Sequence, residues 1–399
     1  MARTEPVSDW ATDFDVLDES YVANPFAIWD DLRETCPVAR TERRGPTHLP
    51  TRYADVTSIA HDPSTFSSLD VAVIPIERGD VEDPLPYGLP PITSDPPLHT
   101  WTRRLLLPWF SHSRVASFEP MTRSLCRTLI EGFLAEGRAD AAADYAQQIP
   151  VRVIAQLLDV PPEMSDTFIG WVRDALEFAD DPERQQRGIF GFGGFVFVKM
   201  EERKVEPGDD LLSYLVSERV DGEPVDDAIV LGMGILTLIA GIDTTWSAIG
   251  SSLWHLATHE DDAARLAAEP ELMTTAVEEL LRAYSPVTMA RVVTTDTEVA
   301  GCPMRAGDKV LMSYPAANRD PAAFERADEV ILDRAANRHV AFGSGIHRCA
   351  GSNLARMELR VALEEWLRAI PSFRLDATRE VTWAGGQVRG PRELPVVFS

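Results

Sequence analysis

One long apolar segment, from Asp226 to His259, limits what this chain can fold into more than any other feature. Between Ile229 and Ile242 the segment carries no charged side chain, and Asp243 is the first acid after it. A helix that is apolar on all sides has to be surrounded by other protein or by lipid. The uncharged run is shorter than the roughly 20 residues that cross a bilayer. We therefore expect one central helix buried in the core of a large fold.

The chain before and around this segment is predicted to be mostly helical, from Arg114 to about Arg282. Apolar residues recur three and four positions apart in 125–133 and in 151–158, which is typical of amphipathic helices. The glycine- and aromatic-rich stretch 191–198 fits either a mobile helix or a turn. Helices therefore dominate the predicted fold.

Short strands are expected mainly after Pro286. The predicted elements there are strands at 291–299 and 309–312, a last helix from about Cys349 to Ile370, and a closing hairpin formed by 381–383 and 394–398. No stretch in the 399 residues looks like a linker between domains. We expect a mainly α fold in which residues 1–399 form a single helix-rich domain with smaller β-sheets.

The charge of the chain narrows the range of partners. Lys and Arg number 38 against 63 Asp and Glu, which gives a formal net charge of −25. Such a surface repels phosphate backbones, so we expect no nucleic-acid partner. Residues 1–15 are acidic and have no apolar core, unlike a signal peptide. We expect a cytoplasmic protein that does not bind a membrane.

Three glycines surround one cysteine in the segment 342–351, F-G-S-G-I-H-R-C-A-G. Cys349 is expected at a helix N-terminus, where free N–H groups and the helix dipole lower a thiol pKa. A thiolate in a glycine-rich loop suits an axial haem ligand. It also suits a nucleophile with a general base in reach, and His347 is two residues away. The third interpretation is a buried structural cysteine, which we adopt for the other cysteines, Cys36, Cys126 and Cys302.

The segment 342–351 resembles the haem-binding signature of the cytochrome P450 family. In that family a cysteine thiolate donates electron density to haem iron and favours O–O cleavage. The resemblance implies the P450 fold, haem b (iron protoporphyrin IX) as cofactor, and Cys349 as the iron ligand. It also implies that Phe342 shields the sulfur and that a backbone N–H, such as that of Gly351, donates to it.

A second motif lies in the central segment, where A-G-I-D-T-T at 240–245 places an acid and hydroxyls among apolar residues. Thr244 can return a hydrogen bond to the Ala240 carbonyl, which weakens and can bend a helix. We expect a local opening there, with Gly241 relieving crowding. The motif resembles the oxygen-activation motif of cytochromes P450, which implies that Asp243 and Thr244 supply protons. A helix kink with an exposed acid is the alternative.

An acid and a base three residues apart, Glu279 and Arg282, can pair on a helix. Their apolar neighbours predict burial, where a charge pair needs a further partner. The family resemblance supplies Arg334 and implies that the three residues are structural rather than catalytic.

The resemblance also implies a set of haem-propionate ligands. Two carboxylates in a mostly apolar pocket need cationic hydrogen-bond donors. The matching positions are His99, Arg103, Arg291 and His347. The first two lie on one face of a helix that is expected to start at Asp95-Pro96-Pro97, with Asp95 as its N-cap.

Apolar side chains near these motifs are candidates for a substrate pocket. The candidates are Leu236, Ala240, Val287 and Met289, the early segment 71–76, and an aromatic lid of Phe192, Phe195 and Phe197. They predict a small hydrophobic substrate, aromatic or terpenoid.

The resemblance implies a monooxygenase that inserts one oxygen atom from O2 into a C–H bond, by hydroxylation or oxidative O-dealkylation. Electrons would come from a ferredoxin-type partner and its NAD(P)H-dependent reductase, with Arg348 and Arg356 as candidate docking cations. The alternatives are an H2O2-driven haem-thiolate peroxygenase and a non-catalytic haem sensor. The Asp243–Thr244 pair argues against both.

Overall fold

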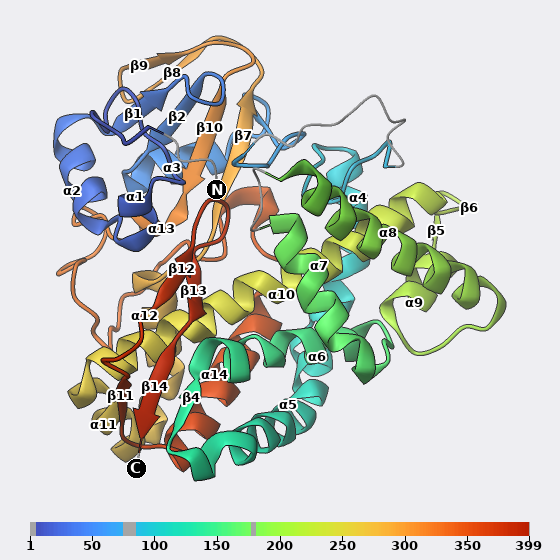
Figure 1. Cartoon of the computed structure of the whole chain (residues 1–399). Helices are drawn as coiled ribbons and strands as arrows, with labels where there is room; N and C mark the ends of the chain where they lie inside the picture. Colours follow the sequence, from blue (N-terminus) through green and yellow to red (C-terminus); the bar gives the residue numbers. More distant parts are fainter. Residues whose placement is uncertain (1–4, 75–84, 177–180, 399) are drawn as a thin grey trace.

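The computed structural model of the chain describes residues 5–74, 85–176 and 181–398 (Figure 1). The α-helices in this part are α1 (Glu19–Ala23), α2 (Phe26–Thr35), α3 (Tyr53–Ala60), α4 (Leu98–Leu106), α5 (His112–Phe133), α6 (Gln148–Leu157), α7 (Ser165–Leu176), α8 (Pro182–Val205), α9 (Leu211–Ser217), α10 (Asp227–Thr258), α11 (Glu260–Ala268), α12 (Met273–Ala283), α13 (Tyr314–Ala317) and α14 (Ser352–Ala369). The strands are β1 (Val38–Thr41), β2 (Thr47–Pro50), β3 (Phe66–Ser67), β4 (Arg138–Asp140), β5 (Arg219–Val220), β6 (Glu223–Pro224), β7 (Thr288–Val293), β8 (Thr297–Val299), β9 (Cys302–Met304), β10 (Lys309–Ser313), β11 (Phe373–Leu375), β12 (Thr382–Ala384), β13 (Gly390–Glu393) and β14 (Pro395–Phe398).

The predicted central helix is α10. It begins after Asp226, whose carboxylate accepts the Ala228 N–H at 2.8 Å, as an N-cap residue does. The helix contacts α6, α8, α12 and α14 and contributes to the largest apolar cluster of the molecule (Figure 1). By length and hydropathy α10 could cross a membrane, but 61% of its apolar window is buried inside the protein. A core helix passes the same test, which agrees with the sequence prediction.

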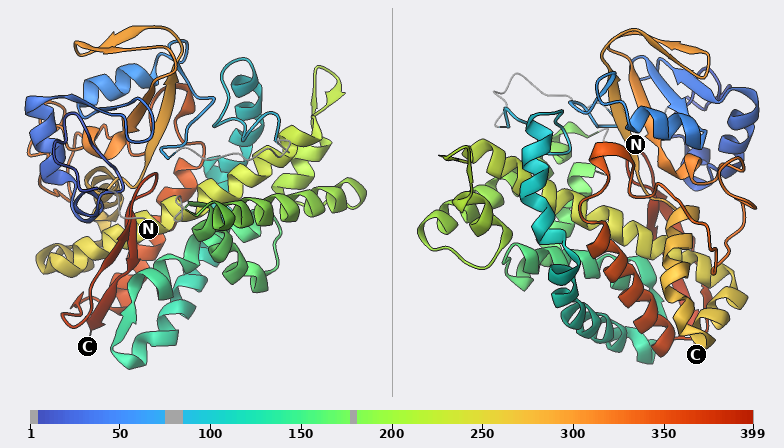
Figure 2. Two further views of the ribbon diagram at one scale, coloured as in Figure 1. Left: turned by 45° about the horizontal axis from the view of Figure 1, so that its top comes forward. Right: turned by 180° about the vertical axis from the view of Figure 1, so that it is seen from behind.

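The largest sheet has the strand order β1-β2-β10-β7-β3. Its middle strand, β10, runs parallel to β2 and antiparallel to β7. Val310 and Met312 belong to one apolar cluster and Leu311 to another, because alternate side chains of a strand point to opposite faces. The sheet is therefore packed on both faces, and Figure 2 shows it with α2 and α3 to one side of the main helical part.

Two strand predictions are wrong in detail. The strand expected at 291–299 is interrupted after Val293, where the Thr294 hydroxyl donates to the Ser64 carbonyl, and resumes as β8. The expected hairpin does not form between its two segments, because β12 pairs with β13 instead. The final strand β14 pairs with β11 and with β4, a strand far away in sequence. Residues 394 and 396 are buried there, so tertiary packing decides this pairing.

The glycine-rich stretch 191–198 lies inside helix α8 and forms no turn. A Cβ atom at Gly191 would lie 2.4 Å from the ring of Trp171 on α7. Glycine at this position therefore serves the close approach of two helices.

Candidate functional site

The cysteine loop, residues 342–351, leads directly into α14. Its ends are joined by a hydrogen bond in which the Cys349 N–H donates to the Phe342 carbonyl at 2.8 Å. Gly345 has φ +67°, and a Cβ there would lie 2.0 Å from the Ala60 carbonyl oxygen. Only glycine fits such a position, so the loop can lie directly against the end of α3.

Cys349 is accessible, and it lies among several positive groups. Although part of Cys349 is accessible, protein atoms crowd around its sulfur and keep water away, which raises the pKa of the thiol; the Gly351 N–H and the guanidinium groups of Arg103 and Arg348 oppose the rise. The predicted lowering of the thiol pKa is therefore wrong for the free thiol, because burial outweighs the helix N-terminus. A coordinated metal ion would deprotonate the thiol outright. The structure places the N–H of Gly351 against this sulfur, as the sequence suggests.

The four expected cationic residues converge beside the cysteine loop. The rings of His99 and His347 lie 4.3 Å apart between centroids, and the Arg103 guanidinium donates to the Arg348 carbonyl. Arg291 is 4% exposed and donates to the Ala290 carbonyl at 2.7 Å. Among the described residues, none of the four forms an ion pair with an acid, and His99 Nε2 is buried without a hydrogen-bond partner.

The electrostatics of these four residues show a shortage of negative charge. Burial lowers the pKa of His99, Arg103 and Arg291. Burial together with Arg291, His99 and Arg103 lowers the pKa of His347 to about 3. The protonated form of each side chain is thus disfavoured by its surroundings, and a bound dianion would oppose this effect on all four.

Ser68, which the sequence did not identify, contacts His347, and Asp95, which it predicted as a helix N-cap, holds Ser68. His347 Nε2 lies 2.9 Å from the Ser68 hydroxyl, which leaves Nδ1 for another partner. The Asp95 carboxylate accepts the Ser68 N–H at 2.9 Å and the Ser67 hydroxyl at 2.6 Å. The N-cap prediction for Asp95 is therefore wrong, since its carboxylate is engaged elsewhere and α4 begins at Leu98 without a side-chain cap.

Asp243 and Thr244 lie in the middle of α10. The Thr244 hydroxyl donates to the Ala240 carbonyl at 2.9 Å, but α10 continues without interruption, so the predicted opening is not seen. A Cβ at Gly241 would lie 2.5 Å from the Ile154 side chain, so this glycine lets α6 pack closely.

The partner of Asp243 comes from the C-terminal part of the chain. Asp243 is 1% exposed, and its Oδ1 lies 2.8 Å from Arg392 Nη2 on β13. Arg392 Nη1 also donates to the Ser247 hydroxyl at 3.0 Å. No local pattern in the sequence links Arg392 to Asp243, because the contact depends on how β13 lies against α10. The alternative of an exposed acid at a kink is wrong.

Glu279, Arg282 and Arg334 form the predicted structural cluster. Arg282 and Glu279 are fully buried and share two hydrogen bonds of 2.8 Å. Arg334 Nε donates to Glu279 at 2.8 Å, and the Ile331 N–H donates to the other carboxylate oxygen. The remaining N–H groups of Arg282 donate to backbone carbonyls, so this cluster is internally satisfied.

Comparisons with known proteins agree with this geometry. A family model described as Cytochrome P450 matches residues 156–381, more than half of the chain. The chain belongs to the cytochrome P450 family.

Individual P450 relatives match over nearly the whole chain. The mycinamicin IV hydroxylase/epoxidase of Micromonospora griseorubida is 35% identical and covers 93% of this chain and 94% of its own. The steroid C26-monooxygenase of Mycobacterium tuberculosis is 32% identical and covers 98% of each. The solved structure of cytochrome P450 CYP109Q5 from Chondromyces apiculatus has a TM-score of 0.88 and 32% identity, and covers 98% of this chain and 99% of its own. The protein is therefore a P450 monooxygenase.

The P450 family implies a haem-thiolate cofactor, and the residues present fit one. The free ring nitrogen of His99 and the buried, acid-free guanidinium of Arg291 match what two propionates require. The loop conformation set by Gly345 leaves Cys349 accessible at the start of α14.

The predicted substrate contacts of this P450 are only partly brought together. Ala240 is exposed and Thr244 partly exposed, although most of α10 around them is buried. Val287 and Met289 are partly exposed, and Leu236 is 9% exposed and lies outside the main apolar cluster. Val71 and Val73 are buried, and Ile76 lies outside the described residues.

The predicted aromatic lid is not a single structure. Phe192 is fully buried and stacks with Phe168, and Phe195 meets the same ring edge-on at 5.0 Å. Phe197 is 51% exposed and therefore points away from the core. Helical spacing separates these side chains onto different faces of α8.

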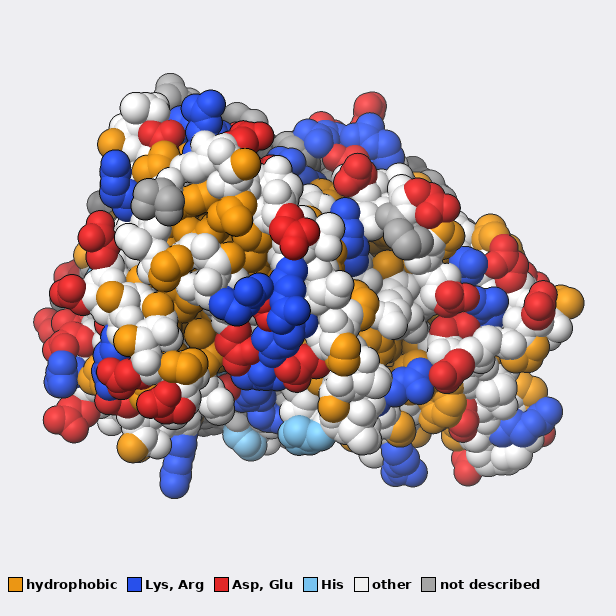
Figure 3. All heavy atoms as spheres, turned by 90° about the horizontal axis from the view of Figure 1, so that it is seen from below, with side chains coloured by type: hydrophobic (Ala, Val, Ile, Leu, Met, Phe, Trp, Pro, Cys, Tyr) orange, Lys and Arg blue, Asp and Glu red, His pale blue; other side chains and the backbone are white. Residues whose placement is uncertain are grey.

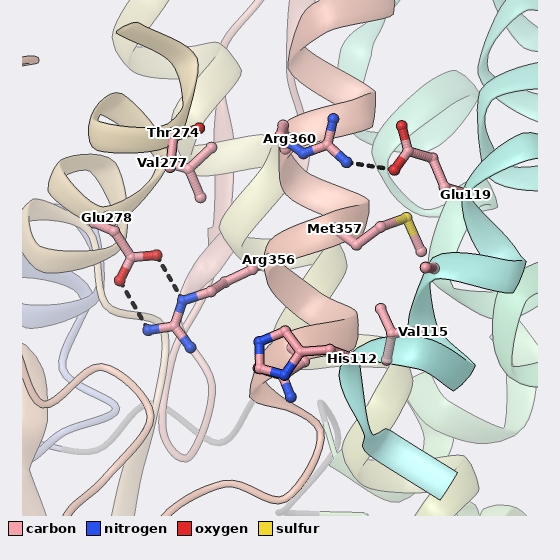
Figure 4. Close-up of a pocket in the computed structure, with 11 residues that line it drawn as sticks. His112, Val115, Glu119, Thr274, Val277, Glu278, Arg356, Met357 and Arg360 are labelled. Carbon is pink, nitrogen blue, oxygen red and sulfur yellow. Dashed lines mark hydrogen bonds and ion pairs between the residues drawn. The ribbon is translucent and has the colours of Figure 1, made fainter. Parts of the chain in front are cut away.

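A cavity of about 260 Å³ opens between α5, α12 and α14 (Figure 4). Arg356 reaches across it to Glu278 with hydrogen bonds of 2.6 and 2.8 Å, and its guanidinium lies 4.4 Å from the Phe342 ring. Burial raises the pKa of Glu278, but hydrogen bonds from Arg356 and His339 outweigh it and lower the pKa to about 2. Arg356 is thus not a free docking cation.

Arg348 differs from Arg356, because it is exposed and forms no ion pair within the described ranges. Figure 3 views the molecule from below, where Lys and Arg side chains gather in the middle of the face beside Asp and Glu. Between α5 and α14, Arg123 pairs with Glu365 and Arg360 with Glu119.

Proposed function

We propose that the chain acts as a single cytoplasmic haem domain that inserts one oxygen atom from O2 into a C–H bond of a hydrophobic substrate. Its cofactor is haem b, held by Cys349 on one side and by His99, Arg103, Arg291 and His347 at the propionates. The observation that carries the proposal is a cluster of four basic side chains without an acid partner among the described residues, with His99 and Arg291 buried, beside an accessible cysteine. When bound, the haem supplies oxygen activation and the oxidising chemistry.

The chain's own residues tune that chemistry on the cysteine side. The Gly351 N–H donates to the Cys349 sulfur and moderates the negative charge of the thiolate. Phe342 shields the sulfur, while its carbonyl fixes the loop through the Cys349 N–H. Ser68 fixes the His347 ring through Nε2, which would leave Nδ1 to bind a propionate.

Proton supply is the role we assign to Asp243 and Thr244. The Thr244 hydroxyl is partly exposed and is held by the Ala240 carbonyl, so its oxygen can accept a further hydrogen bond. Asp243 is buried next to it in the chain and is held by Arg392 and Ser247. Arg392 therefore positions the acid that exchanges protons with the site.

The substrate is proposed to be hydrophobic, with aromatic and terpenoid compounds as the predicted class and hydroxylation or O-dealkylation as the outcome. The accessible surface of Ala240, Leu236, Val287 and Met289 supports an apolar pocket wall. The relatives named above act on mycinamicin IV and on a steroid, which extends the range of compounds to be tested.

Electrons are proposed to arrive from a ferredoxin-type protein and an NAD(P)H-dependent reductase. Exposed Arg348 is adjacent to the iron ligand in sequence, so an acidic partner that docks on it would approach the cofactor closely.

Replacing Cys349 by Ala tests the central assignment. The purified variant is expected to retain far less haem, and any retained haem should lose the red-shifted Soret band of the reduced CO complex that reports thiolate ligation. Cys126→Ala is the matched control, because Cys126 is fully buried away from the loop. A Cys349→Ala variant that keeps the thiolate band would exclude this residue as ligand.

Soret titrations with aromatic, terpenoid and steroid compounds test the substrate proposal. Ala240→Leu is expected to weaken binding of the best compound at least about tenfold, because it overfills the pocket wall. Ala228→Leu, at the start of the same helix, should leave binding unchanged. Equal binding by both variants would show that Ala240 does not face the substrate.

A further inference from the structure

A second cluster of reactive side chains lies where the β8-β9 hairpin meets the large β-sheet, apart from the cysteine loop. Cys302 on β9 has its Sγ 3.8 Å from Nδ1 of His48, which lies on β2. The other ring nitrogen, Nε2, is 3.0 Å from Oδ2 of Asp308, just before β10. Cys302 is partly exposed, whereas His48 is 6% exposed. The sequence prediction of a purely structural Cys302 gave no sign of these partners.

The aspartate fixes the tautomer of the imidazole. Burial raises the pKa of Asp308, but the Arg305 N–H and His48 outweigh this and lower it, so the group is a carboxylate and only accepts hydrogen bonds. His48 Nε2 must then carry the proton. Nδ1 is left with a lone pair that faces the Cys302 thiol, the arrangement in which a histidine acts as base toward a nucleophile.

Metal binding does not explain this cluster. Both ring nitrogens of His48 are engaged within it. In the part of the chain that the structure describes, no group of three or more His, Cys, Asp or Glu side chains is arranged to hold a metal ion.

We propose that Cys302 is a peroxide-reactive thiol whose reaction is assisted by the His48–Asp308 pair. The Cys302 S–H proton passes to His48 Nδ1 while the sulfur attacks one oxygen of hydrogen peroxide and the O–O bond breaks. The leaving hydroxide takes the proton from His48 and becomes water. The sulfur loses two electrons to the peroxide, so that Cys–SH and H2O2 give Cys–SOH and H2O.

The charges around Cys302 explain why a base is needed. Burial, Cys36, Asp308 and Glu298 raise the pKa of the thiol, whereas Arg40, opposite His48 on β1, lowers it. The resting group is therefore the thiol rather than the thiolate. Because a thiol is a weak nucleophile, its reactivity depends on proton transfer to His48 during the attack.

Cys36 provides an internal control. It is also partly buried, but its sulfur contacts only the Val38 carbonyl, at 3.5 Å, among the hydrogen bonds of the described residues. Because both thiols are partly exposed and lie near each other, a difference in reactivity reports their partners, and the His48 and Asp308 variants assign it to the imidazole.

The test treats the holoenzyme with limiting hydrogen peroxide in the presence of dimedone and measures labelling at each cysteine by mass spectrometry. Cys302 is expected to be labelled at least about tenfold more than Cys36. His48→Phe should abolish this difference. Asp308→Asn should reduce it strongly, because an amide can donate to Nε2 and place the proton on Nδ1. Asp308→Glu should restore part of it.

A second measurement separates this proposal from the proposed function. Alkylation of Cys302 by iodoacetamide needs neither peroxide nor haem, so it should show the same dependence on His48 and Asp308 even in protein without monooxygenase activity. Circular dichroism and thermal unfolding identify variants that fail to fold. Equal reaction of Cys302 and Cys36, or labelling of Cys302 that persists in folded His48→Phe and Asp308→Asn proteins, would overturn the proposal.

Discussion

Two clusters of charged and basic side chains in this protein each contain two arginines and differ in their balance of charge. Around Glu279, two arginines, one backbone N–H and one side-chain amide donate hydrogen bonds to the same carboxylate. The other N–H groups of Arg282 donate to backbone carbonyls. Around His347, four basic side chains face one another without an acid partner in the described part of the chain. The first cluster is complete within the protein, and the second is complete only with an anionic ligand.

This difference separates structure from binding. A complete cluster is costly to break, because removing one member leaves another charge buried. An incomplete cluster already carries that cost, so the protein fold does not depend on it in the same way. The balance of charge, rather than burial alone, identifies the ligand site.

Arg282→Met should produce the largest effect on stability. It leaves the Glu279 carboxylate buried with fewer partners, which costs about 3–5 kcal/mol for such pairs. Thermal or urea unfolding measures the loss. Arg326→Met is the control, because Arg326 pairs with Glu329 at the same spacing but on the exposed surface, and it should change stability little. Similar losses of unfolding free energy in Arg282→Met and Arg326→Met would contradict the difference between the buried cluster and the exposed pair.

Arg291→Met should act in the opposite way, on the cofactor rather than the fold. A charge-assisted hydrogen bond is worth about 1.5–3 kcal/mol, so transfer of haem to an acceptor protein should be faster by about 10- to 100-fold. Helical content by circular dichroism should be unchanged. A variant that unfolds like Arg282→Met but retains haem would show that Arg291 is structural.

The sequence predicted the parts of the site that are continuous along the chain. The cysteine loop, the Asp243–Thr244 pair and the central helix each depend on neighbouring residues, so local chemistry indicates them. The family resemblance supplied the more distant cations and Arg334. The burial of His99 and Arg291, and the lack of an acid partner for the four propionate candidates among the described residues, became visible only in the structure.

The residues that the sequence missed are partners brought from elsewhere in the chain. Arg392 reaches Asp243 because β13 lies against α10, and Ser68 reaches His347 across the β-rich part of the fold. Asp95 matched a helix-capping pattern but binds the Ser67–Ser68 segment instead. In each case tertiary packing decides between several partners that the local sequence permits.

Arg392→Met extends the comparison to the ion pair on α10. The change removes the guanidinium that holds the buried Asp243 carboxylate, and we expect a stability loss of about 1–3 kcal/mol. If Arg392 also positions Asp243 for proton supply, the fraction of NAD(P)H electrons recovered in product should fall while hydrogen peroxide release rises.

Arg392→Lys separates the two effects, because it restores a charge but not the two-pronged contact with Asp243 and Ser247. In Arg392→Lys, the free energy of unfolding should recover more fully than the fraction of NAD(P)H electrons that appears in product. If Arg392→Met delivers the same fraction of NAD(P)H electrons to product as the unmodified protein, Arg392 has only a structural role.

Arg348→Glu should have the smallest effect and should leave both clusters intact. Arg348 is exposed and has no ion pair among the described residues, so reversing its charge should not unfold the protein. An acidic redox partner would associate more slowly, and the rate of haem reduction should fall a few-fold at low ionic strength and converge with that of the unmodified protein at high salt. Arg374→Glu makes the same charge change on strand β11 instead of in the cysteine loop, and it should not alter the rate of haem reduction. If the two variants slow reduction equally, the effect belongs to net charge, and docking at Arg348 is excluded.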